Sequence, residues 1–486
     1  MKGNDVSQIG NGSHVPRRHE QGTLLRYGVL TMMTRTLVIR WLLVLLVCAW
    51  GPIFGQGPMA AESLSTSEWM QAQEAFKKFQ FQEVLDLLAT FSEEELKAPD
   101  VLRLKVLSLA LLGKTSESLD TYEQYVKQTG QEDEPLFREL AIAVIIPLRS
   151  DMREQIRGVA YTSLKEIGSD DILPFIEEGL NDKSGMIRVL AAESLAGLAS
   201  GQQSKRFRQA LEDKAGLVRA TVLKGLGRSG DRHAHTLIRP LLKDEQPVVQ
   251  VAAAGAMIKL GYPEYWERVT RSVQESEGYE RGAAYKVLGE LGNVRAVELL
   301  QQGLTDQQPS IRAAAVSSFG KLKAPEAVPP LLAVLNEKSP AVRSAAAVSL
   351  GNLKAEKAIP AITKMLDDAN PGVRVASVAA LLKLNSPFSV VSSTVSSLMQ
   401  DRNPGIRSGI ARALGNGYGR DVITTLFFLL NDPVPKPRIM AARSLGRIGG
   451  RDILPRLKPV LRDQDEAVRA TVAAAIVRIL AQPNNV

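Results

Sequence analysis

The most regular pattern of apolar and polar positions begins at Asp151 and continues to the end of the chain. Each unit starts with an acid, passes through a short polar loop to an Arg, and continues into an Ala-rich stretch with apolar residues at helical spacing. In one unit the first apolar stretch covers 312–319 and a second covers 327–335. The pattern therefore predicts two short helices in each unit.

The unit recurs with a nearly constant period. The step is 31 residues, except for one step of 33 between Arg374 and Arg407, and Gln250 replaces the Arg once. An acid lies six residues before every one of the eleven positions. The Arg residues are Arg157, Arg188, Arg219, Arg281, Arg312, Arg343, Arg374, Arg407, Arg438 and Arg469. Because a single short helix pair cannot bury its apolar face, we expect the pairs to stack.

These repeats predict an all-α fold: an α-solenoid of about eleven stacked antiparallel helix pairs over 151–486, drawn out as a superhelical rod with open ends. In six units Pro stands three residues after the acid, which suits the first turn of a helix. Gly often follows the large apolar residue near the end of the first helix, as at Gly320. We expect this Gly to form a left-handed helix cap.

Residues 62–150 show a second, less regular pattern. Apolar residues at helical spacing occur over 69–79, 81–91, 102–112 and 119–126, and a further helix is expected after the Pro at 135. The short turns resemble those of tetratricopeptide-type helical hairpins. The region carries 16 acidic and 9 basic residues, whereas the repeats carry 34 acidic and 45 basic ones. The two regions therefore have opposite net charges.

Residues 1–61 predict a polar leader and a signal peptide. An apolar block over 41–50 follows basic residues and precedes small ones, an order typical of secretory signals. Translation is expected to start at Met32 or Met33. The block is shorter than the roughly 20 residues that span a bilayer. We expect a periplasmic or secreted protein; the alternative is membrane attachment through an uncleaved signal or a lipidated Cys48.

The composition argues against several classes of enzyme. The 486 residues include one Cys and four His, so no intramolecular disulfide and no Cys-based zinc or iron–sulfur site can form. His233 and His235 share a turn, but no third His or Cys lies nearby, and we expect a solvated turn. No nucleophile elbow, phosphate-binding loop or dinucleotide fingerprint stands in a suitable context. We therefore predict no catalytic residue, no metal and no cofactor.

The repeat phrase resembles HEAT-like repeats, in particular the short bacterial form first associated with phycobilisome lyases. The resemblance covers 151–486 and implies an armadillo-like helical array, but it indicates little about activity. In that family the recurring acid and Arg form a ladder of hydrogen bonds between neighbouring repeats. The resemblance therefore implies a structural role for the matching residues here, among them Asp306, Arg312, Arg343, Asp368 and Arg374.

Two departures from the repeat are candidate binding surfaces. Aromatic residues gather after Gln250 in a chain with only 5% aromatics, and Tyr and Trp are favoured anchors at interfaces. They are Tyr262, Tyr265, Trp266, Tyr279 and Tyr285. A basic stretch over 205–243, which includes Lys205, Arg206 and Arg208, suits an anionic partner. The alternatives are repacking around an irregular repeat and a solvated helix face.

These observations favour a non-enzymatic exported scaffold or adaptor that binds another protein along the surface of the superhelix. Two alternatives apply if the chain is cytoplasmic. By resemblance it would be a bilin lyase-like enzyme or chaperone, or a nucleic-acid-binding HEAT-like protein. Without 1–61 the chain has 54 basic and 50 acidic residues, a small excess that disfavours nucleic acid.

Overall fold

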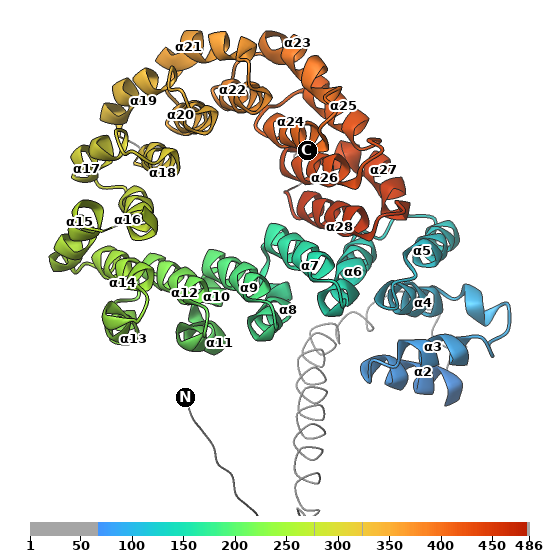
Figure 1. Cartoon of the computed structure of the whole chain (residues 1–486). Coiled ribbons are helices and arrows are strands. Elements are labelled where there is room, and N and C mark those ends of the chain that lie inside the picture. Colours follow the sequence, from blue (N-terminus) through green and yellow to red (C-terminus); the bar gives the residue numbers. More distant parts are fainter. Residues whose placement is uncertain (1–66, 277, 323, 484–486) are drawn as a thin grey trace, which may run out of the picture.

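The computed structural model describes residues 67–276, 278–322 and 324–483, and every regular element in these ranges is a helix. The helices form a ring of two concentric layers around a central opening (Figure 1). Each repeat contributes one long helix to the inner layer and shorter helices to the outer layer. The expected all-α stack of helix pairs is confirmed.

The inner layer holds one helix from each repeat, and neighbouring inner helices contact one another around the ring. These helices are α7 (Glu154–Ile167), α9 (Gly185–Gly197), α12 (Gly216–Arg228), α14 (Pro247–Lys259), α16 (Gly278–Leu291), α18 (Pro309–Phe319), α20 (Pro340–Asn352), α22 (Pro371–Lys383), α24 (Pro404–Leu414), α26 (Pro435–Ile448) and α28 (Glu466–Leu480).

The outer layer consists of shorter helices, many of them extended by 3-10 turns. Its α-helices are α8 (Leu173–Glu178), α10 (Ala199–Gln203), α11 (Lys205–Gln209), α13 (His235–Ile238), α15 (Trp266–Gln274), α17 (Ala296–Gly303), α19 (Val328–Val334), α21 (Ile359–Lys364), α23 (Phe388–Met399), α25 (Arg420–Leu429) and α27 (Leu454–Leu457). The 3-10 helices of the repeats are η4 (Asp170–Ile172), η5 (Gly179–Asn181), η6 (Ala210–Glu212), η7 (Arg232–Ala234), η8 (Arg239–Lys243), η9 (Pro263–Tyr265), η10 (Pro325–Ala327), η11 (Glu356–Ala358), η12 (Met365–Asp367), η13 (Arg451–Ile453) and η14 (Lys458–Arg462).

Proline marks where six inner helices begin. α14, α18, α20, α22, α24 and α26 each start with the Pro that follows the acid loop. The first N–H groups of a helix have no intrahelical partner, so a residue without an N–H is tolerated there, and its fixed φ suits the helix. The sequence-based interpretation of these prolines is confirmed.

The repeated glycines that follow the large apolar residue, such as Gly320, do not form left-handed caps, so that expectation was wrong. A left-handed cap does occur at Gly168, directly after α7. Gly320 has a right-handed φ of −61°. A Cβ there would lie 2.8 Å from the Cα of Ser349 on the next inner helix, closer than real Cβ atoms come. The same contact recurs between Gly289 and Ser318. The repeated Gly therefore lets adjacent inner helices approach closely.

Between residue 67 and the repeats, the structure describes five α-helices and two 3-10 helices. They are α2 (Ser67–Lys77), α3 (Phe81–Leu88), η2 (Glu95–Lys97), α4 (Pro99–Leu111), α5 (Thr115–Thr129), α6 (Glu134–Ile145) and η3 (Ile146–Ser150). α2 packs on α3 and α4 packs on α5, and their apolar side chains join the same core as the repeats. Within 67–483, apart from the two undescribed positions, no helix has both the length and the apolar character that crossing a bilayer requires.

The last helix closes the ring. α28 packs against α26 on one side and against α6 and α7 on the other. Its Ala470, Ala473 and Val477 are at most 1% exposed, although the helix ends the array. The expected rod with open ends was therefore wrong. Because α28 is apolar on all sides, only contact with α6 and α7 keeps its second face out of water.

Ion pairs accompany this closure. Lys458 Nζ lies 2.8 Å from Glu132 Oε1, and Arg462 Nη2 lies 2.8 Å from Asp120 and 3.0 Å from Glu123. The acidic helices that precede the repeats thus meet basic residues of the repeat over 432–462, the one before the last. Since these carboxylates are more than half exposed, each pair contributes only about 0.2–1 kcal/mol. Apolar burial of α28 is therefore the larger contribution to closure.

Candidate functional site

The Arg and acid of each repeat join neighbouring repeats. Arg343 donates from Nε and Nη2 to the two carboxylate oxygens of Asp368 in the next repeat, both at 2.9 Å. Its Nη1 donates to the backbone carbonyl of Glu337, the acid of its own repeat, at 2.8 Å. The hydrogen bonds from Arg343 lower the pKa of Asp368. One Arg thus holds two successive acid loops.

The same contact recurs along the array with interruptions. Arg312 reaches Glu337 at 3.2 Å and donates to the carbonyl of Asp306 at 2.7 Å. Arg374 donates to the backbone carbonyl of Asp368 at 2.8 Å but has no acid partner in the described part of the chain. Its repeat precedes the 33-residue step, where two extra residues alter the position of the next acid. The ladder groups are thus engaged with one another rather than open to a substrate.

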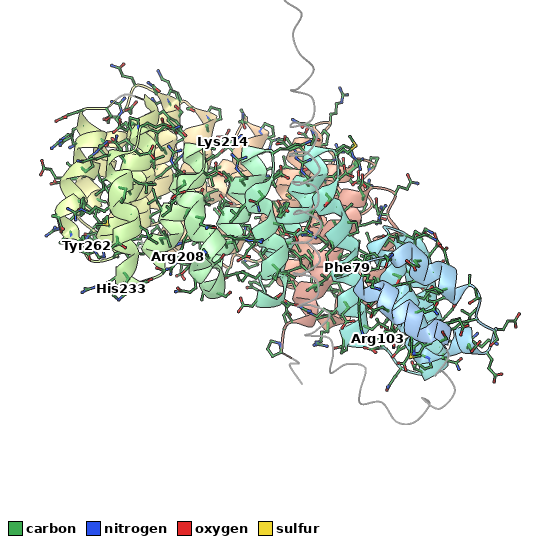
Figure 2. All side chains as sticks on the ribbon, turned by 90° about the horizontal axis from the view of Figure 1, so that it is seen from below. Phe79, Arg103, Arg208, Lys214, His233 and Tyr262 are labelled. Carbon is green, nitrogen blue, oxygen red and sulfur yellow. The ribbon has the colours of Figure 1, made fainter. Side chains whose placement is uncertain are left out.

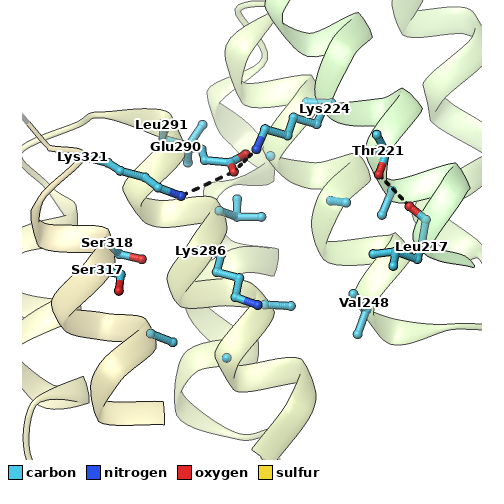
Figure 3. A pocket seen from close by; sticks show the side chains of 18 of the residues that line it. Leu217, Thr221, Lys224, Val248, Lys286, Glu290, Leu291, Ser317, Ser318 and Lys321 are labelled. Carbon is cyan, nitrogen blue, oxygen red and sulfur yellow. Dashed lines mark hydrogen bonds and ion pairs between the residues drawn. The ribbon is translucent and has the colours of Figure 1, made fainter. Parts of the chain in front are cut away.

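A groove of about 1130 Å³ lies on the lumenal side of the ring, the side that faces the central opening. It is lined mainly by the inner helices α12, α14, α16 and α18 (Figure 3). Among the residues that the structure describes, six cations and two acids line it. The cations are Lys165, Lys224, Arg228, Lys259, Lys286 and Lys321, and the acids are Glu193 and Glu290.

Both acids of the groove are paired with groove cations. Lys224 from α12 and Lys321, just after α18, pair with Glu290 of α16 from either side (Figure 3). Glu193 of α9 lies 2.5 Å from Lys165 of α7. The pair between Lys224 and Glu290 joins helices two repeats apart because the lumenal side of the array is concave. Neither carboxylate is left to neutralise the remaining cations.

Three groove cations have no carboxylate partner among the described residues: Arg228, Lys259 and Lys286. Arg228 donates to a backbone carbonyl of α9 at 3.1 Å. Burial lowers the pKa of Lys259; Glu290 opposes that shift, and the charges of Arg228 and Lys224 add to it. The groove therefore holds positive charge that no carboxylate of the described residues pairs with.

The other edge of the groove is apolar. Leu217, Val248 and Tyr279 each stand two residues before the ladder position, so they occupy equivalent places on three successive inner helices. Leu217 is 50% exposed and Tyr279 is 73% exposed. The cations stand five to nine residues after the ladder position, about two to three helical turns further along. The groove thus has an apolar edge and a cationic edge.

The repeat is recognised at the level of sequence families. A model of the family described as HEAT repeats matches residues 204–284, 267–347, 328–391 and 423–484, together just over half of the chain. The chain belongs to the HEAT-repeat family. A comparison with curated proteins found no match.

Several solved structures are similar to this HEAT-repeat chain. The complex of CpcE and CpcF of phycocyanin lyase from Nostoc sp. PCC7120 is 20% identical with a TM-score of 0.35, covering 49% of this chain and 93% of that one. Human deoxyhypusine hydroxylase in complex with glycerol is 20% identical with a TM-score of 0.29, covering 52% and 98%. Kap121p bound to Nup53p is 13% identical with a TM-score of 0.32, covering 83% and 52%. Scores this low carry no argument about function.

The HEAT repeats distribute the predicted aromatic patch over three places. Tyr285 is 2% exposed and belongs to the core, so its assignment to a binding surface was wrong. It stands six residues after Tyr279 on α16, and helical geometry turns the two side chains to different faces. Tyr262, Tyr265 and Trp266 pack partly buried around the start of α15 in the outer layer. Of the five, Tyr279 lines the groove.

The basic stretch over 205–243 does not form one surface either. Arg208 lies at one edge of the ring and Lys214 at the other (Figure 2). Arg206 and Arg208 contact acids of neighbouring repeats at 3.9 and 3.3 Å, and Lys205 is exposed on the outer helix α11. Because each HEAT repeat passes through both layers, consecutive basic residues reach different faces. The expected single anionic-partner surface was therefore wrong.

Of the two repeat histidines, His233 lies in η7 and His235 begins α13. His235 Nδ1 lies 2.8 Å from the carbonyl oxygen of Arg232, and its ring lies 5.4 Å from that of Tyr262. In the part of the chain that the structure describes, no three His, Cys, Asp or Glu side chains form a group that could hold a metal ion. Cys48 and the expected leader and signal over 1–61 lie outside the described residues.

Four groove cations lie outside every surface predicted from the sequence: Lys165, Lys259, Lys286 and Lys321. The signal was nevertheless present: Arg228, Lys259, Glu290 and Lys321 follow one another at steps of 31 residues, each nine residues after the ladder position. This spacing indicates that the four side chains occupy equivalent positions on successive inner helices. Which face of those helices turns toward the lumen became apparent only from the closed ring.

Proposed function

We propose that this HEAT-repeat ring is a non-enzymatic scaffold that binds a segment of another protein in its lumenal groove. The observation that carries the proposal is the combination of unneutralised cations and exposed apolar side chains in one concave surface. Lys259 and Lys286 lack a carboxylate partner among the described residues, while Leu217 and Tyr279 expose apolar groups to the same groove. Exposed apolar surface bordered by polar groups is typical of interaction sites.

The architecture supports such a role without a moving part. The inner helices are held in register by the ladder, by close glycine contacts and by the contact of α28 with α6 and α7. The groove residues therefore stand on rigid elements, which lowers the cost of ordering a binding surface. The proposal keeps the exported location predicted from 1–61, so the partner would be a periplasmic or secreted protein.

Site-specific photo-crosslinking tests the proposal. A benzoylphenylalanine in place of Tyr279 places the reactive group in the groove, and one in place of Tyr418 provides a control with similar exposure, 68%, in the turn between α24 and α25. The full chain is expressed in its source cells, irradiated and fractionated. We expect a protein adduct of defined mass at position 279, in the periplasmic or secreted fraction, and none at position 418.

The outcomes separate the two parts of the proposal. Equal adducts at both positions, or none at position 279, would contradict binding in the groove. A groove adduct confined to the cytosolic fraction would contradict export and leave groove binding in place.

A further inference from the structure

We infer that the groove takes an amphipathic, acidic α-helix of the partner, with its carboxylates on the cationic edge and its apolar side chains on the apolar edge. The inference rests on the proposed function and gives the chemistry of the segment that is bound. Three properties of the groove support it: its charge, the separation of its two edges and its length.

The positive charge of the groove favours an acidic binding segment. After the pairs with Glu193 and Glu290 are formed, Arg228, Lys259 and Lys286 still lack a carboxylate in the described ranges. These three come from three successive inner helices, α12, α14 and α16. Carboxylates of a partner would neutralise these cations. The groove is partly desolvated, so each ion pair formed there is more favourable than the same pair on an open surface.

The separation of the edges selects a helix. On α16, Tyr279 and Lys286 are seven residues apart, and on α12 the same interval separates Leu217 from Lys224. At 1.5 Å per residue the apolar edge is about 10 Å from these two lysines along the inner helices. Arg228 and Lys259 stand eleven residues after Leu217 and Val248, about 16 Å from that edge, and their long side chains reach back toward it. An α-helix with its side chains is about 10–12 Å across. A helix lying across the inner helices therefore reaches both edges with opposite sides.

The groove also sets the length of the helix. Packed helices have axes about 8–10 Å apart, so the three intervals from α12 to α18 cover about 27 Å. A helix of that length has about 18 residues. The bound segment is thus expected to be an amphipathic helix of about five turns.

Two other occupants fit the groove less well. Residues 1–66 of this chain contain more Lys and Arg than Asp and Glu, so their charge matches that of the groove instead of complementing it. A nucleic acid would bring a continuous row of phosphates past Glu193 and Glu290 and would leave the apolar edge at Leu217 and Tyr279 unused. A partner with separate acidic and apolar faces meets both edges.

Fluorescence anisotropy with three labelled probes and the full chain tests the inference. The first probe is an 18-residue helical peptide with Glu on one face and Leu on the other. The second has the same composition, rearranged so that Glu and Leu mix around the helix. The third is a single-stranded oligothymidylate of equal charge. We expect the first peptide to bind most tightly.

Paired variants localise the binding. Lys259→Glu with Lys286→Glu reverses the cationic edge and should weaken the amphipathic peptide about tenfold or more, since two favourable charge contacts become repulsive. Leu217→Ser with Tyr279→Ser removes the apolar edge and should weaken it about fivefold or more. Lys214→Glu with Lys243→Glu makes the same charge change at exposed positions outside the groove and should change affinity less than about twofold. Circular dichroism melting confirms that each variant is folded.

Several results would overturn the inference: equal affinity for the rearranged peptide, tighter binding of the oligothymidylate, no binding of either peptide, or an equal loss in the control pair. If no peptide binds while the cross-link at position 279 still captures a protein, the acidic helix is wrong and the scaffold function stands. If both fail, both are wrong.

Discussion

At the scale of single residues, the contacts of the ladder Arg restrict which residue type can occupy its position. Arg188 is 5% exposed, donates from Nε and Nη2 to Asp213 at 2.7 and 2.9 Å, and donates from Nη1 to the carbonyl of Asp182 at 2.9 Å. A planar guanidinium offers two parallel N–H groups that match both oxygens of a carboxylate and keeps a further N–H for the carbonyl, whereas an ammonium lacks this bidentate geometry. Gln250 keeps only the carbonyl contact, to Asp244 at 2.6 Å.

Replacing Arg188 should therefore cost more than replacing a ladder Arg that lacks an acid. Arg188→Ala leaves the carboxylate of Asp213 without its guanidinium, and we expect the free energy of unfolding to fall by about 3 kcal/mol. Arg374→Ala removes bonds to backbone carbonyls only and should cost about 1 kcal/mol. Urea unfolding measures both, and equal losses would show that the acid partner does not carry the stability.

At the scale of elements, small residues set how closely the inner helices pack. Gly320 stands where a side chain would meet the backbone of the next inner helix at Ser349. Short helices cannot gain much stability from their own hydrogen bonds, so contact with neighbours provides most of it. Glycine at this point lowers helix propensity, and the closer packing that it allows offsets the loss.

Alanine substitutions at two glycines should consequently have opposite effects. Gly320→Ala places a Cβ 2.8 Å from the Cα of Ser349 and should destabilise the array by about 1–3 kcal/mol. Gly197→Ala on α9 meets no atom within 4 Å and should stabilise it by up to about 1 kcal/mol through helix propensity. Thermal melting of the two variants checks the signs. A stabilising Gly320→Ala would mean that close approach is not the reason for the glycine.

At the scale of the whole molecule, burial of apolar side chains where α28 meets α6 and α7 closes the repeat array into a ring. α28 contacts α26 as any inner helix contacts its neighbour, and it also contacts α6 and α7. The accompanying pairs, such as Lys458 with Glu132, are exposed and screened by salt. The ring should therefore stay closed at high ionic strength and open when the apolar contact is disrupted.

A charge on the closing face of α28 tests this expectation. Val477 is 1% exposed and stands eight residues after the ladder position, the place from which Gly446 faces the next helix. Val477→Asp should open the ring and increase the radius of gyration in small-angle X-ray scattering, because an unpaired carboxylate is costly in an apolar contact. Val348→Asp, at a position that is 41% exposed on α20, is the matched control and should leave the radius unchanged. A closed ring in the Val477 variant would assign closure to the ion pairs instead.

The sequence by itself determined the repeat, the all-α fold and the starts of many inner helices. Each of these depends on interactions within one unit or between adjacent units, such as Pro309 at the start of α18 or Arg343 beside Asp368. Local chemistry that recurs every 31 residues is readable from spacing alone.

The tertiary structure decided the ring, the role of the glycines and the location of the groove. Curvature sums small rotations over eleven units, and no single unit encodes whether the ends meet. Lys259 and Tyr279 became parts of one site because the curvature of the array turns one face of the inner helices toward the lumen. Tyr285 became part of the core because it faces Gly303 of the outer helix α17. α6 and α28 are far apart in sequence. The pattern of their charged and apolar residues is explained only by the contact between these two helices where the ring closes.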